Sequence, residues 1–130
     1  MTVDSYDERP DVAPRAICIE GNEEGFRSLA EIMALYLNEL EDVLPVSALP
    51  LVSSGIAKSF TIRFSYGDQV GQVAQGSVVE SADQLEWRLS ETEASVVATS
   101  LHGIGYAYEH LHFDPTPGTS EYAVYCGRLD

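Results

Sequence analysis

The strongest local pattern in this chain is an amphipathic stripe near its N-terminus. Its apolar members recur at three- and four-residue spacing, at Phe26, Leu29, Ala30, Met33, Leu37 and Leu40. Asn22 is a suitable N-cap residue, and Glu23 and Glu24 complement the positive end of the helix dipole. The pattern predicts a helix of about 18 residues whose exposed face is acidic and carries Glu24 and Glu31.

Short alternating runs predict the strands. They cover residues 15–20, 59–66 and 84–90 and the second half of 69–80. Ser90 and Glu93 have the spacing of a capping box, which predicts a second helix directly after the strand at 84–90. Towards the C-terminus, "HLHFD", a "PTPGTS" turn and "EYAVYCGRL" predict an antiparallel pair.

Helices thus alternate with runs of strands, which favours the α+β class. We expect a single mixed or antiparallel sheet of about five or six strands, with two helices packed on one face. Residues 1–14 hold four acids and two prolines, and they predict a flexible acidic arm before a single domain at 15–130. Residues 41–57, with two prolines and a glycine, predict an irregular connection. The sequence contains no recognisable internal repeat.

Charge limits the partners of the chain. Its 130 residues hold 21 acidic against 7 basic side chains, a formal net charge of −14, which repels nucleic acid and anionic membranes. No apolar run reaches the roughly 20 residues that a membrane helix requires, and the acidic start is unlike a signal peptide. We therefore expect a cytoplasmic protein that binds neither nucleic acid nor membrane.

The strand before the last turn raises the question of a metal site. His110, His112 and Asp114 would project from one face at about 7 Å spacing, with Leu111 and Phe113 towards the core. Zinc or iron requires three converging protein ligands, which adjacent positions of one strand seldom supply. His110 and His112 therefore stay weak metal candidates, and we favour a recognition surface on this face.

Catalytic arrangements are not recognisable. No Gly-x-Ser-x-Gly elbow occurs, and "GNEEG" lacks the lysine of a phosphate loop. Cys18 and Cys126 each lie in an apolar stretch, where a free thiol acts as a small buried hydrophobe. We expect neither an enzyme nor a cofactor.

Two blocks of the sequence resemble a known family. "IEGNEEGFRSLAEIM" near the start and "HLHFDP…SEYAVY" at the end are similar to the small α+β immunity proteins of bacterial polymorphic toxin systems, most closely to their family thirty-two. The resemblance covers about 30 residues and implies a protein that neutralises a toxin by direct, noncatalytic binding.

The resemblance and the charge together indicate a basic protein toxin, such as a nuclease, as partner. Acidic groups speed the capture of a basic target, and a few buried anchors supply the affinity. The residues predicted to bind the partner form two patches: Glu24 and Glu31 on the first helix, and His110, His112, Asp114 and Tyr122 near the C-terminus. The alternatives are a metal-binding domain or metal-dependent enzyme using His110 and His112, and an acidic accessory or oligomerisation module. An edge strand near either terminus makes a homodimer possible.

Overall fold

A computed structural model of the chain describes residues 1–6, 15–56, 58–67, 77–104, 110–113 and 122–128. Its elements, in chain order, are β1 (Thr2–Tyr6), β2 (Arg15–Gly21), α1 (Glu23–Asn38), β3 (Val43–Leu44), the 3₁₀ turn η1 (Val46–Ala48), β4 (Ser53–Ser54), β5 (Ser59–Ser65), β6 (Ser77–Glu80), β7 (Gln84–Ser90), α2 (Glu91–His102), β8 (His110–Phe113) and β9 (Tyr122–Arg128). The α+β class is confirmed.

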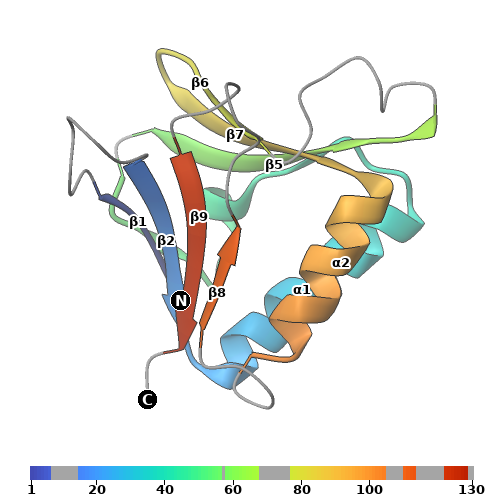
Figure 1. Ribbon diagram of the computed structural model, residues 1–130, viewed down its shortest axis with the longest axis horizontal. Helices are drawn as coiled ribbons and strands as arrows, with labels where there is room; N and C mark the ends of the chain where they lie inside the picture. The colour runs from blue at the N-terminus through green and yellow to red at the C-terminus, as the bar shows by residue number, and fades with distance from the viewer. Residues whose placement is uncertain (7–14, 57, 68–76, 105–109, 114–121, 129–130) are drawn as a thin grey trace.

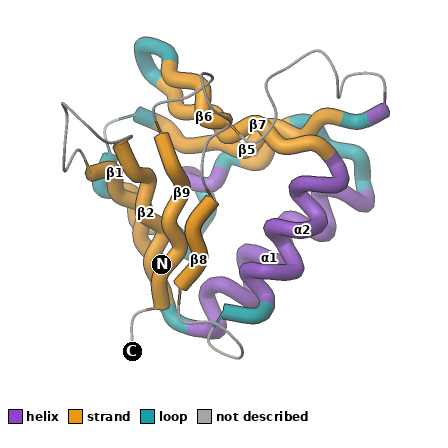
Figure 2. The backbone as a smooth tube through the Cα atoms, viewed as in Figure 1, coloured by secondary structure: helices purple, strands orange, loops and turns teal. Residues whose placement is uncertain are grey.

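The strands form two sheets, so the prediction of a single sheet is wrong. Sheet A has the order β4-β1-β2-β9-β8, and sheet B has the order β3-β5-β7-β6. The two sheets stand at an angle to each other, and the pair of helices closes the remaining side of the core (Figure 1). The tube view shows the same three-sided arrangement, with α1 and α2 lying next to each other (Figure 2).

Both sheets are mixed. In sheet A, β2 runs parallel to β9 and antiparallel to β1, while β8 and β9 form the antiparallel pair predicted near the C-terminus. In sheet B, β5 runs parallel to β7, and both edge strands are antiparallel. Parallel neighbours cannot be joined by a tight turn, and each of these pairs joins segments from different halves of the chain.

Both predicted helices are confirmed at their N-termini. The Asn22 side chain accepts a hydrogen bond from the Gly25 amide at 2.8 Å, and Ser90 and Glu93 complete the capping box of α2. The buried positions of each helix share one stripe: Phe26, Leu29, Ala30 and Met33 in α1, and Ala94, Val97, Ala98 and Leu101 in α2.

The first helix ends two residues earlier than predicted, and Leu40 is 64% exposed rather than part of its buried stripe. The chain reverses there, because the Leu40 amide donates to the Leu37 carbonyl and the Glu41 amide donates to the Tyr36 carbonyl. This is the Schellman arrangement, which needs a left-handed residue, and Leu40 has a φ of 54°.

Glycine at position 40 is therefore expected to stabilise the protein. The left-handed conformation costs a residue with a Cβ roughly 1 kcal/mol, so Leu40→Gly should raise the free energy of unfolding by about 0.5–1 kcal/mol. Urea denaturation measures the change. Leu40→Ala is the control, because alanine removes the exposed leucine but keeps the Cβ. An equal gain in both variants would contradict the conformational explanation.

The two halves of the chain share one topology. An antiparallel pair, β1 with β2, leads into α1 and then into a second pair, β3 with β5, and the series β6, β7, α2, β8 and β9 repeats this order. Each second pair joins the sheet of the other half. The buried positions of the two helices also stand at the same steps from the N-cap residue, so that Ala30 in α1 corresponds to Ala98 in α2. The sequence conceals this repetition, because it lies in topology and burial and not in residue identity.

Residues 2–6 do not belong to a flexible arm. They form β1, which pairs with β2 over five positions, and Val3 is completely buried. The prediction was wrong for this segment because Val3 is an isolated apolar residue among polar neighbours, and its burial depends on the partner strand. The rest of the predicted arm, residues 7–14, lies outside the described residues.

Candidate partner-binding surface

The orientation of α1 follows from its buried stripe. Phe26, Leu29 and Met33 face the core, so the opposite side of the helix, with Glu24 and Glu31, is exposed as predicted. We call Glu23, Glu24, Arg27 and Glu31 the acidic α1 face. Arg27 Nη2 lies 2.7 Å from Glu23 Oε1, a pair separated by one helical turn.

The acidic α1 face keeps a negative excess. Arg27 is engaged by Glu23, and within the described ranges neither Glu24 nor Glu31 has an ion pair. Other cations are held elsewhere in the protein, since Lys58 pairs with Glu80, and Arg63 and Arg88 both pair with Glu86. The surface therefore presents Glu24 and Glu31 as carboxylates that form no ion pair with the described residues, while Arg27 beside them is held by Glu23.

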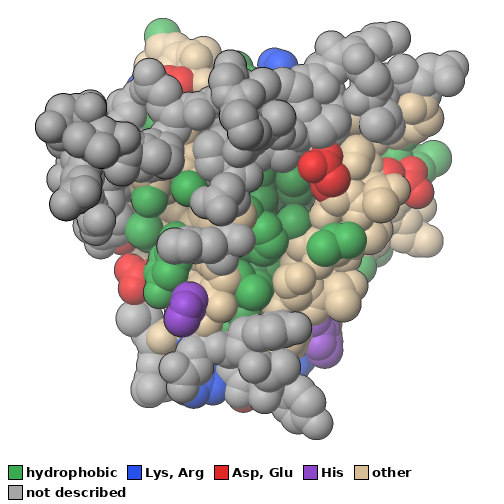
Figure 3. All heavy atoms as spheres, viewed as in Figure 1, with side chains coloured by type: hydrophobic (Ala, Val, Ile, Leu, Met, Phe, Trp, Pro, Cys, Tyr) green, Lys and Arg blue, Asp and Glu red, His purple; other side chains and the backbone are tan. Residues whose placement is uncertain are grey.

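A second group of acids lies where α1 ends and α2 begins. The Tyr66 hydroxyl donates to the Glu41 carbonyl oxygen at 2.7 Å. Burial raises the pKa of Tyr66, and the carboxylates of Glu91, Asp42 and Glu41 raise it further. Figure 3 shows acidic side chains over the end of the helix pair at which α2 begins. Acids thus stand at both ends of the helix pair.

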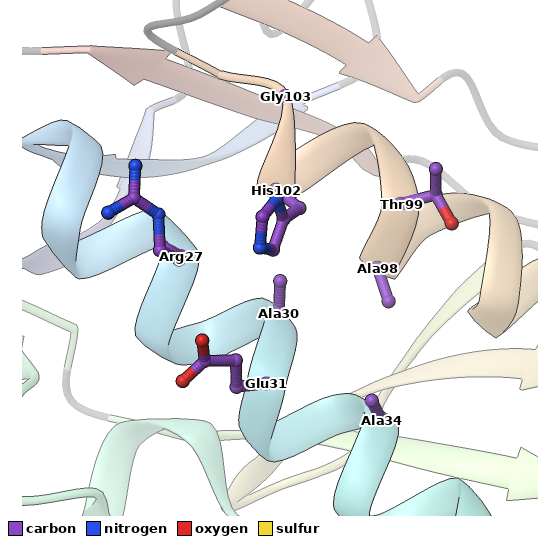
Figure 4. Close-up of a pocket in the computed structure, with 8 residues that line it drawn as sticks. All are labelled: Arg27, Ala30, Glu31, Ala34, Ala98, Thr99, His102 and Gly103. Carbon is purple, nitrogen blue, oxygen red and sulfur yellow. The ribbon is translucent and has the colours of Figure 1, made fainter.

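Between the helices lies a groove of about 630 Å³. We call it the helix groove, and its lining residues are Arg27, Ala30, Glu31, Ala34, Ala98, Thr99, His102 and Gly103. The close-up shows the His102 ring extending between the two helices beside Ala30 (Figure 4). A polar depression at the start of α1 shares Arg27 and Glu31 with the groove, so the groove adjoins the acidic α1 face.

The predicted C-terminal patch is only partly described. His110 is exposed on β8, and its ring stacks on Tyr125 with centroids 6.0 Å apart. Leu111 and Phe113 pack against the core as predicted, which places His110 on the opposite face of sheet A. The His112 side chain and Asp114 lie outside the described residues.

Tyr122 is not available on the surface as the second patch requires. Its side chain is buried, with 6% exposed, and its hydroxyl donates to Glu80 Oε2 at 3.0 Å. Because Tyr122 lies on β9 and Glu80 lies on β6, this hydrogen bond connects sheet A to sheet B. Glu80 also pairs with Lys58. The alternating run at 122–128 predicts the strand but does not show which of its two faces is buried.

The two predicted patches do not come together. The acidic α1 face is on the outer side of the helix pair, whereas His110 is on the face of sheet A that points away from the core. A partner protein whose contact surface is centred on α1 would therefore not have His110 at the centre of that surface. The structure brings the acidic α1 face together with the helix groove instead, and α2 was not included in the predicted site.

Sequence patterns also missed Glu86, which lies on the outer face of sheet B with 5% exposed. Arg88 Nε lies 2.8 Å from Glu86 Oε1, and Arg63 Nε lies 3.0 Å from Oε2. Burial raises the pKa of Glu86, but the hydrogen bonds and charges of the two arginines outweigh it and hold the pKa below its ordinary value. The carboxylate is therefore ionised, and both of its oxygens are bound by arginines of the fold.

The side chains that could take part in catalysis or metal binding include the thiol of Cys126. Cys126 is completely buried, and burial raises the pKa of its thiol, with a further contribution from Cys18. The thiol is therefore protonated and points into the core. Within the described ranges no three His, Cys, Asp or Glu side chains gather around a point that could hold a metal ion. Neither α1 nor α2, the helices among the described residues, is long and apolar enough to cross a membrane.

Comparison with known proteins gives no match: no family model fits the chain, and no curated protein or solved structure is significantly similar to it. The resemblance to immunity proteins therefore stays a prediction.

Proposed function

We propose that this protein is an immunity-like protein of the cytoplasm that neutralises a basic protein toxin by noncatalytic binding. The observation that carries the proposal is the acidic α1 face, where Glu24 and Glu31 are exposed and have no ion pair among the described residues. Carboxylates in this state are free to attract an incoming cationic surface.

Electrostatic steering suits such a task. A protein that must block a toxin before damage accumulates benefits from fast association, and complementary charge raises association rates at low salt. The acids at both ends of the helix pair extend the negative field, and the net charge of −14 acts in the same direction at longer range. Affinity itself would come from apolar contacts, for which the helix groove lies beside the acidic face.

The function is tested by protection from a toxin. The protein is used as bait in its own host, captured basic proteins are expressed alone in a bacterial strain, and growth is measured with and without this chain. A captured protein that arrests growth, and whose effect disappears on coexpression, establishes neutralisation. If every captured protein is harmless when expressed alone, the proposed function is wrong.

The role of the acidic α1 face has its own prediction. Glu24→Gln with Glu31→Gln should lower the association rate with the toxin roughly threefold to tenfold at low salt and flatten its salt dependence, because two steering charges are removed. Stopped-flow mixing at several salt concentrations measures both quantities.

The matched control changes the same net charge elsewhere. Glu20→Gln with Asp83→Asn removes two carboxylates from β2 and from the turn before β7. This variant should keep nearly the original rate. Equal slowing by both pairs would show that only total charge matters, and the acidic α1 face would lose its special role.

A further inference from the structure

The helix groove exists because small residues meet where the two helices pack together. Ala30 and Ala98 hold corresponding positions in the two halves of the chain, and both are buried, with 3% and 8% exposed. Ala34 follows Ala30 by one turn and is exposed, which leaves the groove open above it. The floor is therefore apolar and shallow enough for another backbone to come close.

The walls of the groove differ in charge. On α1, Glu31 is an exposed carboxylate, and Glu23 holds the neighbouring Arg27. The corresponding wall of α2 offers Thr99 and His102 and contains no carboxylate. Thr99 donates its hydroxyl hydrogen to the Ser95 carbonyl at 2.9 Å, so this donor is already used within α2. The groove is thus apolar below and carries one carboxylate, Glu31, on its α1 side.

The dimensions favour a helical ligand. On α1 the lining residues Arg27, Ala30, Glu31 and Ala34 cover two turns of one helix face, a length of roughly 10 Å. Packed helices lie about 8–10 Å apart when small side chains meet, and the groove between two helices is a common seat for a third.

Charge decides which helix fits. A second copy of this chain would bring its own Glu24 and Glu31 against the same carboxylates, which opposes self-association on this face. A cationic helix meets the complementary charge of Glu31 on the α1 wall. The cation of that wall, Arg27, is already paired with Glu23. An acidic helix would be repelled.

We propose that the helix groove binds a basic amphipathic helix of the partner protein. An apolar side chain of that helix packs on Ala30, Ala34 and Ala98, and a lysine or arginine one turn away pairs with Glu31. This inference rests on the proposed function for the identity of the partner, but the groove can be tested without it.

The probe is a synthetic amphipathic peptide of leucine and lysine at helical spacing, with a leucine–glutamate peptide as its charge-reversed control. Binding is followed by fluorescence anisotropy, and the site is mapped by amide chemical shifts of the full chain. The lysine peptide should shift amides of residues 27–34 and 98–103, and the glutamate peptide should not bind. Shifts centred on sheet A or sheet B would overturn the proposal.

Two matched variants separate the groove from the rest of the surface. Ala34→Trp fills the open end of the floor and should weaken the lysine peptide by about tenfold or more. Val96→Trp adds the same side chain at a position that is 59% exposed and outside the groove lining, and it should leave binding unchanged. Equal denaturation midpoints would show that both variants are folded, and Ala34→Leu provides a milder filling substitution if the tryptophan is not tolerated. Unchanged peptide binding in a folded groove-filled variant contradicts the proposal.

The outcomes for the groove and for the proposed function are distinguishable. Toxin protection that survives Ala34→Trp with undiminished affinity leaves the function in place and removes the groove. Specific binding of the lysine peptide in the groove, together with failure to find any neutralised toxin, keeps the groove and removes the immunity function.

Discussion

Replacement of Trp87 by alanine is expected to lower the free energy of unfolding by about 3–5 kcal/mol. Trp87 lies on β7 with 2% exposed, and its ring meets Phe113 of β8 with centroids 5.4 Å apart and planes tilted by 53°. It therefore joins sheet B to sheet A. The substitution removes the buried aromatic surface and leaves a cavity at the junction of the two sheets.

Urea denaturation followed by far-ultraviolet circular dichroism measures this loss without relying on the indole as reporter. Trp87→Phe is the control, since it keeps an aromatic ring and should cost clearly less. If the alanine variant does not fold, the phenylalanine variant still provides a measurable difference. A loss below about 1 kcal/mol in the alanine variant would contradict the placement of Trp87 between the sheets.

Replacement of Glu86 by glutamine is expected to cost about 2–3 kcal/mol at neutral pH. The carboxylate accepts from Arg63, Arg88 and Gln84, at distances between 2.8 and 3.1 Å. An amide of the same shape offers only one accepting oxygen and turns a donor towards an arginine. The side chains of Arg63 and Arg88 are 42% and 29% exposed, so water compensates part of the loss.

The pH dependence of this effect has a defined sign. Because the folded pKa of Glu86 is held below its ordinary value of 4.5, its contribution is fully present above that value and is lost as pH falls through the folded pKa. The difference in stability between the two proteins should therefore shrink below about pH 4. Denaturation at several pH values measures it.

Glu23→Gln is the matched control for Glu86. It breaks a similar pair, Arg27 with Glu23, in which both side chains are well exposed, at 47% and 40%. Exposed pairs contribute about 0–1 kcal/mol, so this variant should change stability only slightly. Equal losses in the two variants would show that burial does not strengthen the Glu86 pairs.

Elements whose evidence is local were predictable. The stripe that begins at Phe26 and the capping box of Ser90 and Glu93 each describe contacts within a few residues, and both helices begin where these patterns place them. The same holds for the hairpin of β8 and β9, whose strands are close in the chain. The exposure of Glu24 and Glu31 followed from the helix period alone.

Features that depend on distant partners were not predictable. Alternation in β5 and β7 reveals two faces for each strand, but nothing in it shows that they pair with each other in a sheet separate from β2 and β9. Tyr122 was predicted to bind the partner, but it is buried, and its hydroxyl bonds to Glu80 of the other sheet. The ion pairs of Glu86 likewise join β5 to β7.

The candidate site divides in the same way. The acidic face of α1 follows from the order of its residues, because the helical period alone decides which side chains share the exposed face. The helix groove depends on the meeting of Ala30 and Ala98, residues from different halves of the chain whose small size has no visible meaning until the helices pack. Local hydrogen bonding and periodicity therefore determined the helices and the charge they expose. Long-range pairing and packing alone decided that the strands divide into two sheets and that an apolar groove opens beside the acids, because those contacts join residues that no short stretch of sequence contains together.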